Sequence, residues 1–318
     1  MSFSRYCFLF IFAFSLASLF CWILIPLLKK FHAGQNILSY VKEHEKKSGT
    51  PTMGGLSFVV AAVISVLVFA IELDRTLIVS LVVGLAYMLV GLLDDFLKKK
   101  RKENLGLTAW QKIVFQTLVA FFASLYAVRA GLTTVNIPFF DLQVDFGWWL
   151  LPVSVFVFLA TVNCVNLTDG LDGLAAGVCT PFFLFFGVLI GTGEEGTLSV
   201  LSVALAAALL GYLIFNSPPA SVFMGDTGSL ALGGFAACIG VFSGNFLYIA
   251  IVGIAFVLSG ASVIIQVLYF KATGGKRVFK MTPIHHHFQQ SGYSESKIAY
   301  VYFAETLVLA AICLAFAL

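Results

Sequence analysis

Charged side chains are scarce in this sequence. Only 11% of its 318 residues are Asp, Glu, Lys or Arg, and 60% are hydrophobic. About 25% of the residues of a typical soluble domain are charged, and no soluble globular protein needs this much apolar surface. The composition therefore argues against a soluble protein and predicts a membrane protein that crosses the bilayer many times.

Cys-x-x-Cys pairs and the usual pattern of a cleavable leader are also missing from this sequence. The six cysteines are scattered through apolar runs without Cys-x-x-Cys spacing, so we interpret them as small buried hydrophobes and not as disulfide or zinc ligands. The first apolar run, 6–28, is too long for a signal peptide and lacks a small-residue cleavage pattern. We expect it to be retained as a membrane span.

Long apolar runs make up most of the chain. Runs of about 20 residues are long enough to cross a bilayer as helices. The predicted spans are 6–28, 53–71, 76–97, 109–130, 147–165, 170–191, 197–215, 228–243, 246–270 and 297–317. No repeat or linker separates them, so the chain is predicted to be a single all-α polytopic membrane domain, 1–318, with about ten transmembrane helices.

Basic residues predict the orientation of these spans. Sixteen of the 19 Lys and Arg residues fall in loops on one side, and only Arg5, Arg75 and Arg129 fall on the other. Basic loops remain in the cytoplasm, so both termini are predicted to lie outside. The outer loop, about 131–147, alternates apolar and polar residues around Pro138, which favours a short β-hairpin.

Acidic residues gather at the cytoplasmic ends of the spans. Five aspartates lie there: Asp94, Asp95, Asp169, Asp172 and Asp226. Ion-coupled transporters more often place acids near the membrane midplane, where Glu305 is this chain's only candidate. The distribution favours chemistry at the cytoplasmic interface.

Asp94 and Asp95 end the third predicted span. They can be read as interfacial acids neutralised by the lysine run that follows. Carboxylates just inside the apolar boundary are costly, however, which favours a functional role. Adjacent helical residues point about 100° apart, so the two are expected to differ in role. Two close like charges raise one pKa, which suits a base or a metal-linked carboxylate.

A polar stretch, 163–175, joins the fifth and sixth predicted spans. One of its acids can cap the sixth helix, which accounts for that acid alone. Asp169 and Asp172 are three residues apart, so on a helix they share a face and present several oxygens to one ligand. For Gly170, Gly173 and Gly177 we favour close helix packing.

Two glycine-containing turns face the same side. In 223–229, Asp226 or Thr227 can simply cap the eighth span, or the turn can hold Asp226 at a helix start beside a metal–phosphate group. In 47–55, a lysine and a flexible backbone can wrap phosphate oxygens, although the order of glycine and lysine is not that of a Walker A loop.

Three adjacent histidines, 285–287, lie in the last cytoplasmic loop. Such a run suggests a transition metal, but in an extended chain only His285 and His287 converge, and no cysteine lies nearby. Polar contact with phosphate or substrate is the favoured interpretation.

Five motifs occur in order along the chain. They are Lys-Ser-Gly-Thr-Pro-Thr-Met-Gly-Gly at 47–55, the aspartate pair at 94–95, Asn-Leu-Thr-Asp-Gly-Leu-Asp-Gly-Leu-Ala at 166–175, Met-Gly-Asp-Thr-Gly-Ser at 224–229 and Pro-Ile-His-His-His-Phe at 283–288. Together they resemble the phospho-N-acetylmuramoyl-pentapeptide transferase family, which belongs to the polyprenyl-phosphate N-acetylhexosamine-1-phosphate transferases. The resemblance covers essentially the whole chain, including its ten spans.

The resemblance implies a reaction of peptidoglycan synthesis. UDP-N-acetylmuramoyl-pentapeptide and undecaprenyl phosphate give lipid I and UMP, with Mg²⁺ as cofactor. It also implies a homodimer in the bilayer of the bacterial cytoplasmic membrane, with the active site facing the cytoplasm and no nucleic-acid partner. The transfer proceeds either by direct attack of the lipid phosphate, which we favour, or through a phospho-aspartate.

The resemblance also implies roles for individual residues. Asp226 is the expected magnesium ligand, Asp94 the group that contacts or deprotonates the lipid phosphate, and Asp95 and His285 complete the catalytic set. The expected substrate-binding residues are Lys47, Thr52, Asn166, Asp169, Gly170, Leu171, Asp172, Asn216, Phe223, Gln266 and His286.

The chain departs from the family pattern after the histidines. It reads Gln289-Gln290-Ser291-Gly292-Tyr293, where many members are expected to have a glutamate first and a tryptophan last. A sister enzyme that moves N-acetylglucosamine-1-phosphate is the nearest alternative, which the 283–287 motif argues against. A multi-span transporter is the alternative of another class.

Overall fold

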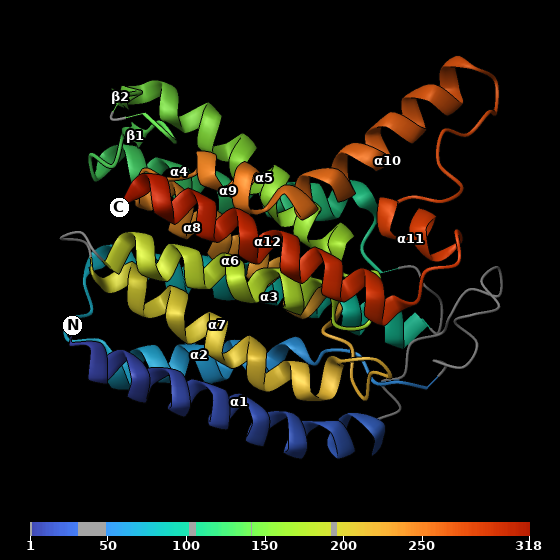
Figure 1. Cartoon of the computed structure of the whole chain (residues 1–318), viewed down its shortest axis with the longest axis horizontal. Coiled ribbons are helices and arrows are strands. Elements are labelled where there is room, and N and C mark those ends of the chain that lie inside the picture. Colours follow the sequence, from blue (N-terminus) through green and yellow to red (C-terminus); the bar gives the residue numbers. More distant parts are fainter. Residues whose placement is uncertain (1, 31–48, 102–105, 141, 192–195) are drawn as a thin grey trace.

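The computed structural model describes residues 2–30, 49–101, 106–140, 142–191 and 196–318. Within these ranges the chain forms a bundle of long, roughly aligned helices with one small sheet at an end (Figure 1). The helices are α1 (Phe3–Lys30), α2 (Gly55–Phe69), α3 (Arg75–Arg101), α4 (Ala109–Arg129), α5 (Leu150–Thr168), α6 (Leu174–Gly191), α7 (Gly196–Asn216), α8 (Gly225–Phe242), α9 (Leu247–Val252), α10 (Ile254–Ala272), α11 (Ile284–Gln289) and α12 (Glu295–Ala317).

Nine helices of the described chain are long and apolar enough to cross a membrane. The prediction of an all-α polytopic membrane protein is therefore confirmed. The second expected span is the exception, because α2 has 15 residues and is about 22 Å long at 1.5 Å per residue. A bilayer core is about 30 Å thick, so α2 alone falls short of the length expected for 53–71.

The ninth expected span, 246–270, is two helices and not one. The short α9 ends at Val252, and α10 starts at Ile254 after the break at Gly253. Glycine favours such a break because it has no Cβ and weakens a helix. Beyond this break α10 leans away from the bundle (Figure 1). Its large apolar side chains are exposed at Ile264 and Leu268, as expected for a lipid-facing helix.

The centre of the bundle is built around α8. Every residue from Thr227 to Phe242 is buried, so this helix is covered by the rest of the protein on all sides. It packs against α3 and α5, while α6, also largely buried, packs between α7 and α12. The start of α8 lies beside the last turns of α3, which places Asp226 close to the aspartate pair of α3.

The small sheet lies in the segment where a hairpin is expected. Strand β1 (Thr134–Asn136) pairs antiparallel with β2 (Gln143–Asp145), and Val135 lies opposite Val144. The sheet, the start of α1 and the end of α12 all lie at one end of the bundle (Figure 1). The membrane side on which this end lies stays a prediction.

Candidate active site

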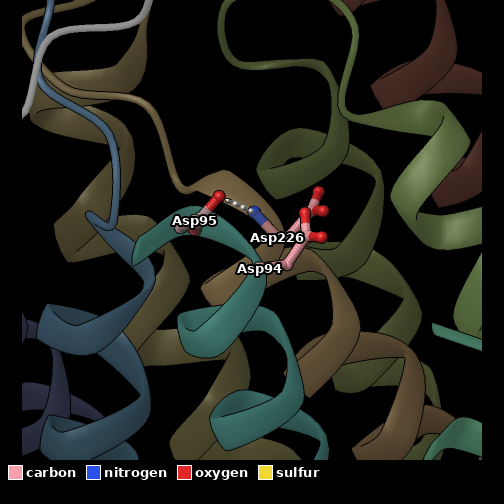
Figure 2. Close-up of side chains that lie close together, drawn as sticks. All are labelled: Asp94, Asp95 and Asp226. Carbon is pink, nitrogen blue, oxygen red and sulfur yellow. Dashed lines mark hydrogen bonds between the residues drawn. The ribbon is translucent and has the colours of Figure 1, made fainter. Parts of the chain in front are cut away.

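Three aspartates meet where α3 and α8 touch. Asp94, Asp95 and Asp226 can each offer a carboxylate oxygen, and these oxygens all lie within 4.8 Å of one another. Asp94 and Asp95 are almost fully buried, at 2% and 4% exposed. Figure 2 shows the carboxylates of Asp94 and Asp226 side by side, whereas Asp95 turns toward the backbone of Asp226. The two neighbours on α3 thus make different contacts, as their helical spacing predicts.

The close approach of α3 and α8 depends on Gly91. A Cβ at this position would overlap the carbonyl oxygen of Asp226 and lie 2.7 Å from the backbone nitrogen of Thr227. Only glycine lets the two backbones come this near. Gly91 lies one turn before the aspartate pair, so this contact sets the distance between the carboxylates of the two helices.

Asp95 binds the first turn of α8. Its Oδ1 accepts a hydrogen bond from the backbone N–H of Asp226 at 3.2 Å. Its Oδ2 accepts from the backbone N–H of Thr227 at 3.0 Å and from the Thr227 hydroxyl at 2.7 Å. The first N–H groups of a helix have no partner within it and attract a negative charge. A carboxylate of α3 therefore caps α8 and holds Asp226 in place.

Two lysines balance the charge of the cluster. Lys98 Nζ lies 2.6 Å from Asp94 Oδ2 and 2.9 Å from Asp226 Oδ2, and Lys112 Nζ lies 2.7 Å from the same Asp226 oxygen. Both lysines are basic residues that the sequence suggests as groups able to gather anionic substrates, and Lys98 follows Asp94 by four positions, the spacing of a helical ion pair. The sequence does not indicate which acid Lys112 meets, because that contact depends on how α4 packs.

Asn166 joins the polar stretch to the cluster. Its Nδ2 donates to Asp226 Oδ1 at 2.8 Å and to the Ser229 hydroxyl at 2.7 Å. The last turn of α5 therefore lies against the first turn of α8. Of the expected substrate-binding residues, Asn166 is the one that bonds directly to a cluster carboxylate in the described chain.

The residues after α5 form turns and not the start of a helix. Asp169 follows the last residue of α5, and α6 begins only at Leu174. Gly173 has a φ of +72°, which L side chains rarely adopt. Asp169 and Asp172 therefore do not share a helix face, contrary to the prediction. Asp172 Oδ2 instead accepts a hydrogen bond from the backbone N–H of Ala220 at 2.9 Å. The prediction of close helix packing at Gly177 is also wrong, since a Cβ at this position would meet no atom within 4 Å.

The Asp169 carboxyl group is poorly solvated. Burial raises its pKa to about 8, and nearby aspartate carboxylates contribute to the rise. The folded chain therefore holds a proton on Asp169 more tightly than the unfolded chain does. This preference stabilises the fold fully below the ordinary pKa of 3.8, and the contribution is lost as the pH rises toward about 8.

Asp169→Asn removes this pH dependence. We expect the variant to melt at a higher temperature than the wild type at pH 8.5, because asparagine carries no charge into the poorly solvated site. At pH 5 this advantage should be smaller, since Asp169 is then protonated in the folded chain although it is ionised in the unfolded chain. Thermal melts in detergent at both pH values measure this, and a variant less stable than the wild type at pH 8.5 contradicts it.

The histidines lie on a short helix, α11, and not on an extended segment. Consecutive residues therefore point about 100° apart, which corrects the expected convergence of His285 and His287. His285 is fully buried, and within the described chain neither of its ring nitrogens has a hydrogen-bond partner. It lies against Gly170, where a Cβ would overlap its Nε2. Burial and the neighbouring His286 lower the pKa of His285 to about 3, so its ring is neutral.

Two expected substrate-binding residues make contacts within the fold. Asn216 accepts from the backbone N–H of Gly173 at 3.1 Å and donates to the Val222 carbonyl at 2.9 Å. Gln266 Oε1 accepts from the backbone N–H groups of both Val278 and Phe279 at 3.0 Å. Both side chains thus stabilise loops that border the candidate site.

The other expected residues lie around the cluster or outside the described chain. Leu171 is buried, and the backbone of Phe223 bonds to Pro51 and Gly54, which joins the two glycine-containing turns. His286 lies beside His285. Lys47 falls outside the described residues.

The donor set of the cluster suits magnesium. Three carboxylates can supply oxygen ligands, which Mg²⁺ prefers, and the candidate metal site found in the described chain contains neither histidine nor cysteine. The Thr52 hydroxyl is buried without a hydrogen-bond partner, and a Cβ at Gly225 would lie 2.6 Å from it and overlap Asp95 Oδ2. An unsatisfied oxygen beside the carboxylates fits a site that takes a cation.

Comparison with known proteins points to one family. A model described as glycosyl transferase family 4 matches residues 77–244, and a phospho-N-acetylmuramoyl-pentapeptide-transferase signature matches residues 47–59. A phospho-N-acetylmuramoyl-pentapeptide-transferase of Clostridium perfringens strain 13 is 44% identical over 95% of this chain and 96% of its own length. Proteins of the same name from Listeria monocytogenes and Halalkalibacterium halodurans are each 43% identical, over 89% and 91% of this chain and 89% and 90% of their own lengths.

Proposed function

This chain belongs to the phospho-N-acetylmuramoyl-pentapeptide transferase family, and we propose that it transfers this group from UDP to undecaprenyl phosphate, giving lipid I and UMP. The observation that carries the proposal is the buried cluster of Asp94, Asp95 and Asp226, whose carboxylates form ion pairs with two lysines. Transfer between two anionic phosphates needs cationic groups where negative charge builds up. Lys98 and Lys112 supply such groups, and the three carboxylates can hold a cation, next to apolar helices that suit a prenyl tail.

The proposal includes magnesium, held by Asp226. Bound there, the ion supplies a Lewis acid that neutralises charge on the diphosphate. Asp95 keeps Asp226 oriented through its hydrogen bonds to the backbone of the first turn of α8. Asn166 donates a hydrogen bond to Asp226 Oδ1 and fixes the orientation of this carboxylate. The Thr52 hydroxyl and an Asp95 oxygen both border Gly225 and add to this oxygen-rich wall.

Asp94 is the residue proposed to act on the lipid phosphate. Its Oδ1 accepts from the backbone N–H of Leu107 at 2.7 Å and its Oδ2 pairs with Lys98, so its orientation is fixed. In direct attack, a lipid phosphate oxygen forms the new bond to the β-phosphorus while the bond from that phosphorus to the bridging oxygen breaks. The electron pair leaves with UMP, and Lys98 and Lys112 stabilise the charge that develops.

The sugar nucleotide is proposed to bind along the turn after α5. Asp169, Gly170, Leu171 and Asp172 form this turn, and His285 and His286 of α11 cover it. Asn216, Phe223 and Gln266 support the loops around it. Lys47 is proposed to reach the phosphates.

The proposed setting is the bacterial cytoplasmic membrane, with the aspartate cluster facing the cytoplasm. The basic residues of the loops support this orientation, because such loops remain inside. The cluster lies at the end of α3, opposite the end that carries the β1–β2 sheet. Assembly as a homodimer is part of the proposal and rests on the family alone.

UMP release tests the proposed function directly. Detergent-solubilised protein with magnesium and undecaprenyl phosphate should release UMP from UDP-N-acetylmuramoyl-pentapeptide and form a lipid-linked product. UDP-N-acetylglucosamine serves as the matched control and should give none. Turnover of only the control substrate would identify the sister activity, and absence of UMP with both would refute a transferase and favour a transporter.

A second measurement separates the two chemical routes. With direct attack, protein incubated with labelled UDP-N-acetylmuramoyl-pentapeptide but without undecaprenyl phosphate carries no label after denaturation. A labelled aspartyl phosphate would establish the two-step route instead.

A further inference from the structure

Glu295, at the start of α12, connects two parts of the proposed substrate site. Its Oε1 accepts a hydrogen bond from Gln289 Nε2 of α11 at 3.1 Å. Its Oε2 accepts from the backbone N–H of Asp172 at 3.3 Å. One carboxylate therefore ties the histidine helix to the turn that follows α5, and neither Glu295 nor Gln289 has an assigned role.

The contact with Glu295 determines which way the Gln289 amide points. An ionised carboxylate only accepts hydrogen bonds, so the amide NH₂ must face Glu295. The amide oxygen, Oε1, then faces His286 Nδ1 at 3.1 Å. An amide oxygen also only accepts, so Nδ1 must carry the proton. In the neutral ring the other nitrogen, Nε2, is therefore an acceptor.

His286 Nε2 points toward the proposed substrate turn. A Cβ at Gly170 would lie 3.0 Å from this atom. Gln289 is only 9% exposed, so its amide is held inside the protein and does not rotate freely in water. The chain of contacts from Glu295 through Gln289 thus fixes the protonation of the ring whose Nε2 faces the turn.

We propose that Gln289 and Glu295 are positioning residues that keep His286 in its Nδ1–H form, so that Nε2 accepts a hydrogen bond from a hydroxyl or imide N–H group of the sugar nucleotide. The proposal rests on the proposed function. It also refines the expected role of His286, because a lone pair repels phosphate oxygens. His286 accordingly contacts a neutral donor of the substrate and not its diphosphate.

Gln289 is uncharged, and the absence of a charge at this position matters beside the Glu295 carboxylate. A carboxylate at this position would face the Glu295 carboxylate, and two close like charges favour uptake of a proton by the group or by its neighbours. With glutamine, the pair bonds without that repulsion, and position 289 itself adds no negative charge beside His286.

The test exchanges the side chains of the hydrogen-bonded pair Gln289 and Glu295. Gln289→Leu removes both hydrogen bonds, Gln289→Glu places two carboxylates together, and Glu295→Gln removes the charge that orients the amide. The double variant Q289E/E295Q restores every contact with the roles exchanged, since the carboxylate at position 289 accepts from both the amide at position 295 and His286. For each protein, UMP release gives kcat and the KM for UDP-N-acetylmuramoyl-pentapeptide from pH 5.5 to 9, and thermal melting confirms folding.

We expect Gln289→Leu to raise this KM about three- to tenfold with a smaller change in kcat. This is the effect of losing one hydrogen bond between His286 and the substrate. The double variant should recover a near wild-type KM at pH 8.5. The acid limb of its kcat/KM profile should move to higher pH, because a carboxylate beside Nδ1 favours the imidazolium, which cannot accept a hydrogen bond.

Two results would overturn the proposal. One is a Gln289→Leu variant with wild-type KM and an unchanged pH profile, and the other is a double variant no better at pH 8.5 than the single ones. Wild-type protein that releases no UMP refutes the proposed function instead, so the two failures are distinguishable.

Discussion

Asp226→Asn is expected to reduce UMP release by roughly 10²–10³-fold, the usual cost of removing one group that stabilises developing charge. Asparagine keeps the size of the side chain and an oxygen for the Asn166 amide, so the fold should survive. The negative charge shared by Lys98, Lys112 and the proposed magnesium is lost, however. Turnover in detergent and thermal melting with and without magnesium measure the two effects.

The magnesium melt provides a readout that does not depend on turnover. A ligand that binds the folded state raises its melting temperature, so magnesium should stabilise the wild type and not the variant. Glu305→Gln is the matched control, because it removes a carboxylate from a membrane helix, α12, away from the cluster. Near-normal turnover of Asp226→Asn, or an equal loss in the control, would refute the metal role of Asp226.

Gly91→Ala is the second substitution with a large expected effect. Its Cβ would overlap the carbonyl oxygen of Asp226, and the obstructing atoms belong to the backbone and cannot rotate away. The helices α3 and α8 must separate, which overpacking data suggest costs about 1–3 kcal/mol of the free energy of unfolding. A displacement of about 1 Å between catalytic groups can lower turnover roughly 100-fold.

Gly177→Ala is the matched control for this substitution. It makes the same change within a buried helix, α6, but its Cβ meets no atom within 4 Å. We expect unchanged turnover and a melting temperature equal to or above that of the wild type, since alanine favours a helix by up to about 1 kcal/mol over glycine. Equal behaviour of the two variants would contradict the close contact at Gly91.

The location of the helices could be predicted from the sequence. In a bilayer a spanning segment must satisfy its own backbone hydrogen bonds, so apolar length alone indicates a helix. Each of the ten predicted spans accordingly coincides with helix in the described chain. The break at Gly253 and the late start of α6 at Leu174 were missed, because one glycine can be tolerated within a helix or can end it according to its neighbours.

The candidate site could be predicted only in part. The costly aspartates at the span ends and the five ordered motifs indicated Asp94, Asp95 and Asp226 as members of one site, and the structure brings their carboxylates together. No pattern in the sequence indicated that Asp95 caps α8. That contact joins residues 132 positions apart, and it exists only because two helices pack closely enough.

By itself, the sequence determined the class of membrane protein, its family and its set of acidic residues, since these follow from composition and local motifs. Only the tertiary structure decided which groups touch: Lys112 with Asp226, and Gln289 between Glu295 and His286. The physical reason is that a hydrogen bond or an ion pair needs atoms within about 3 Å. That distance is set by residues such as Gly91, whose small size has no visible consequence until two helices meet.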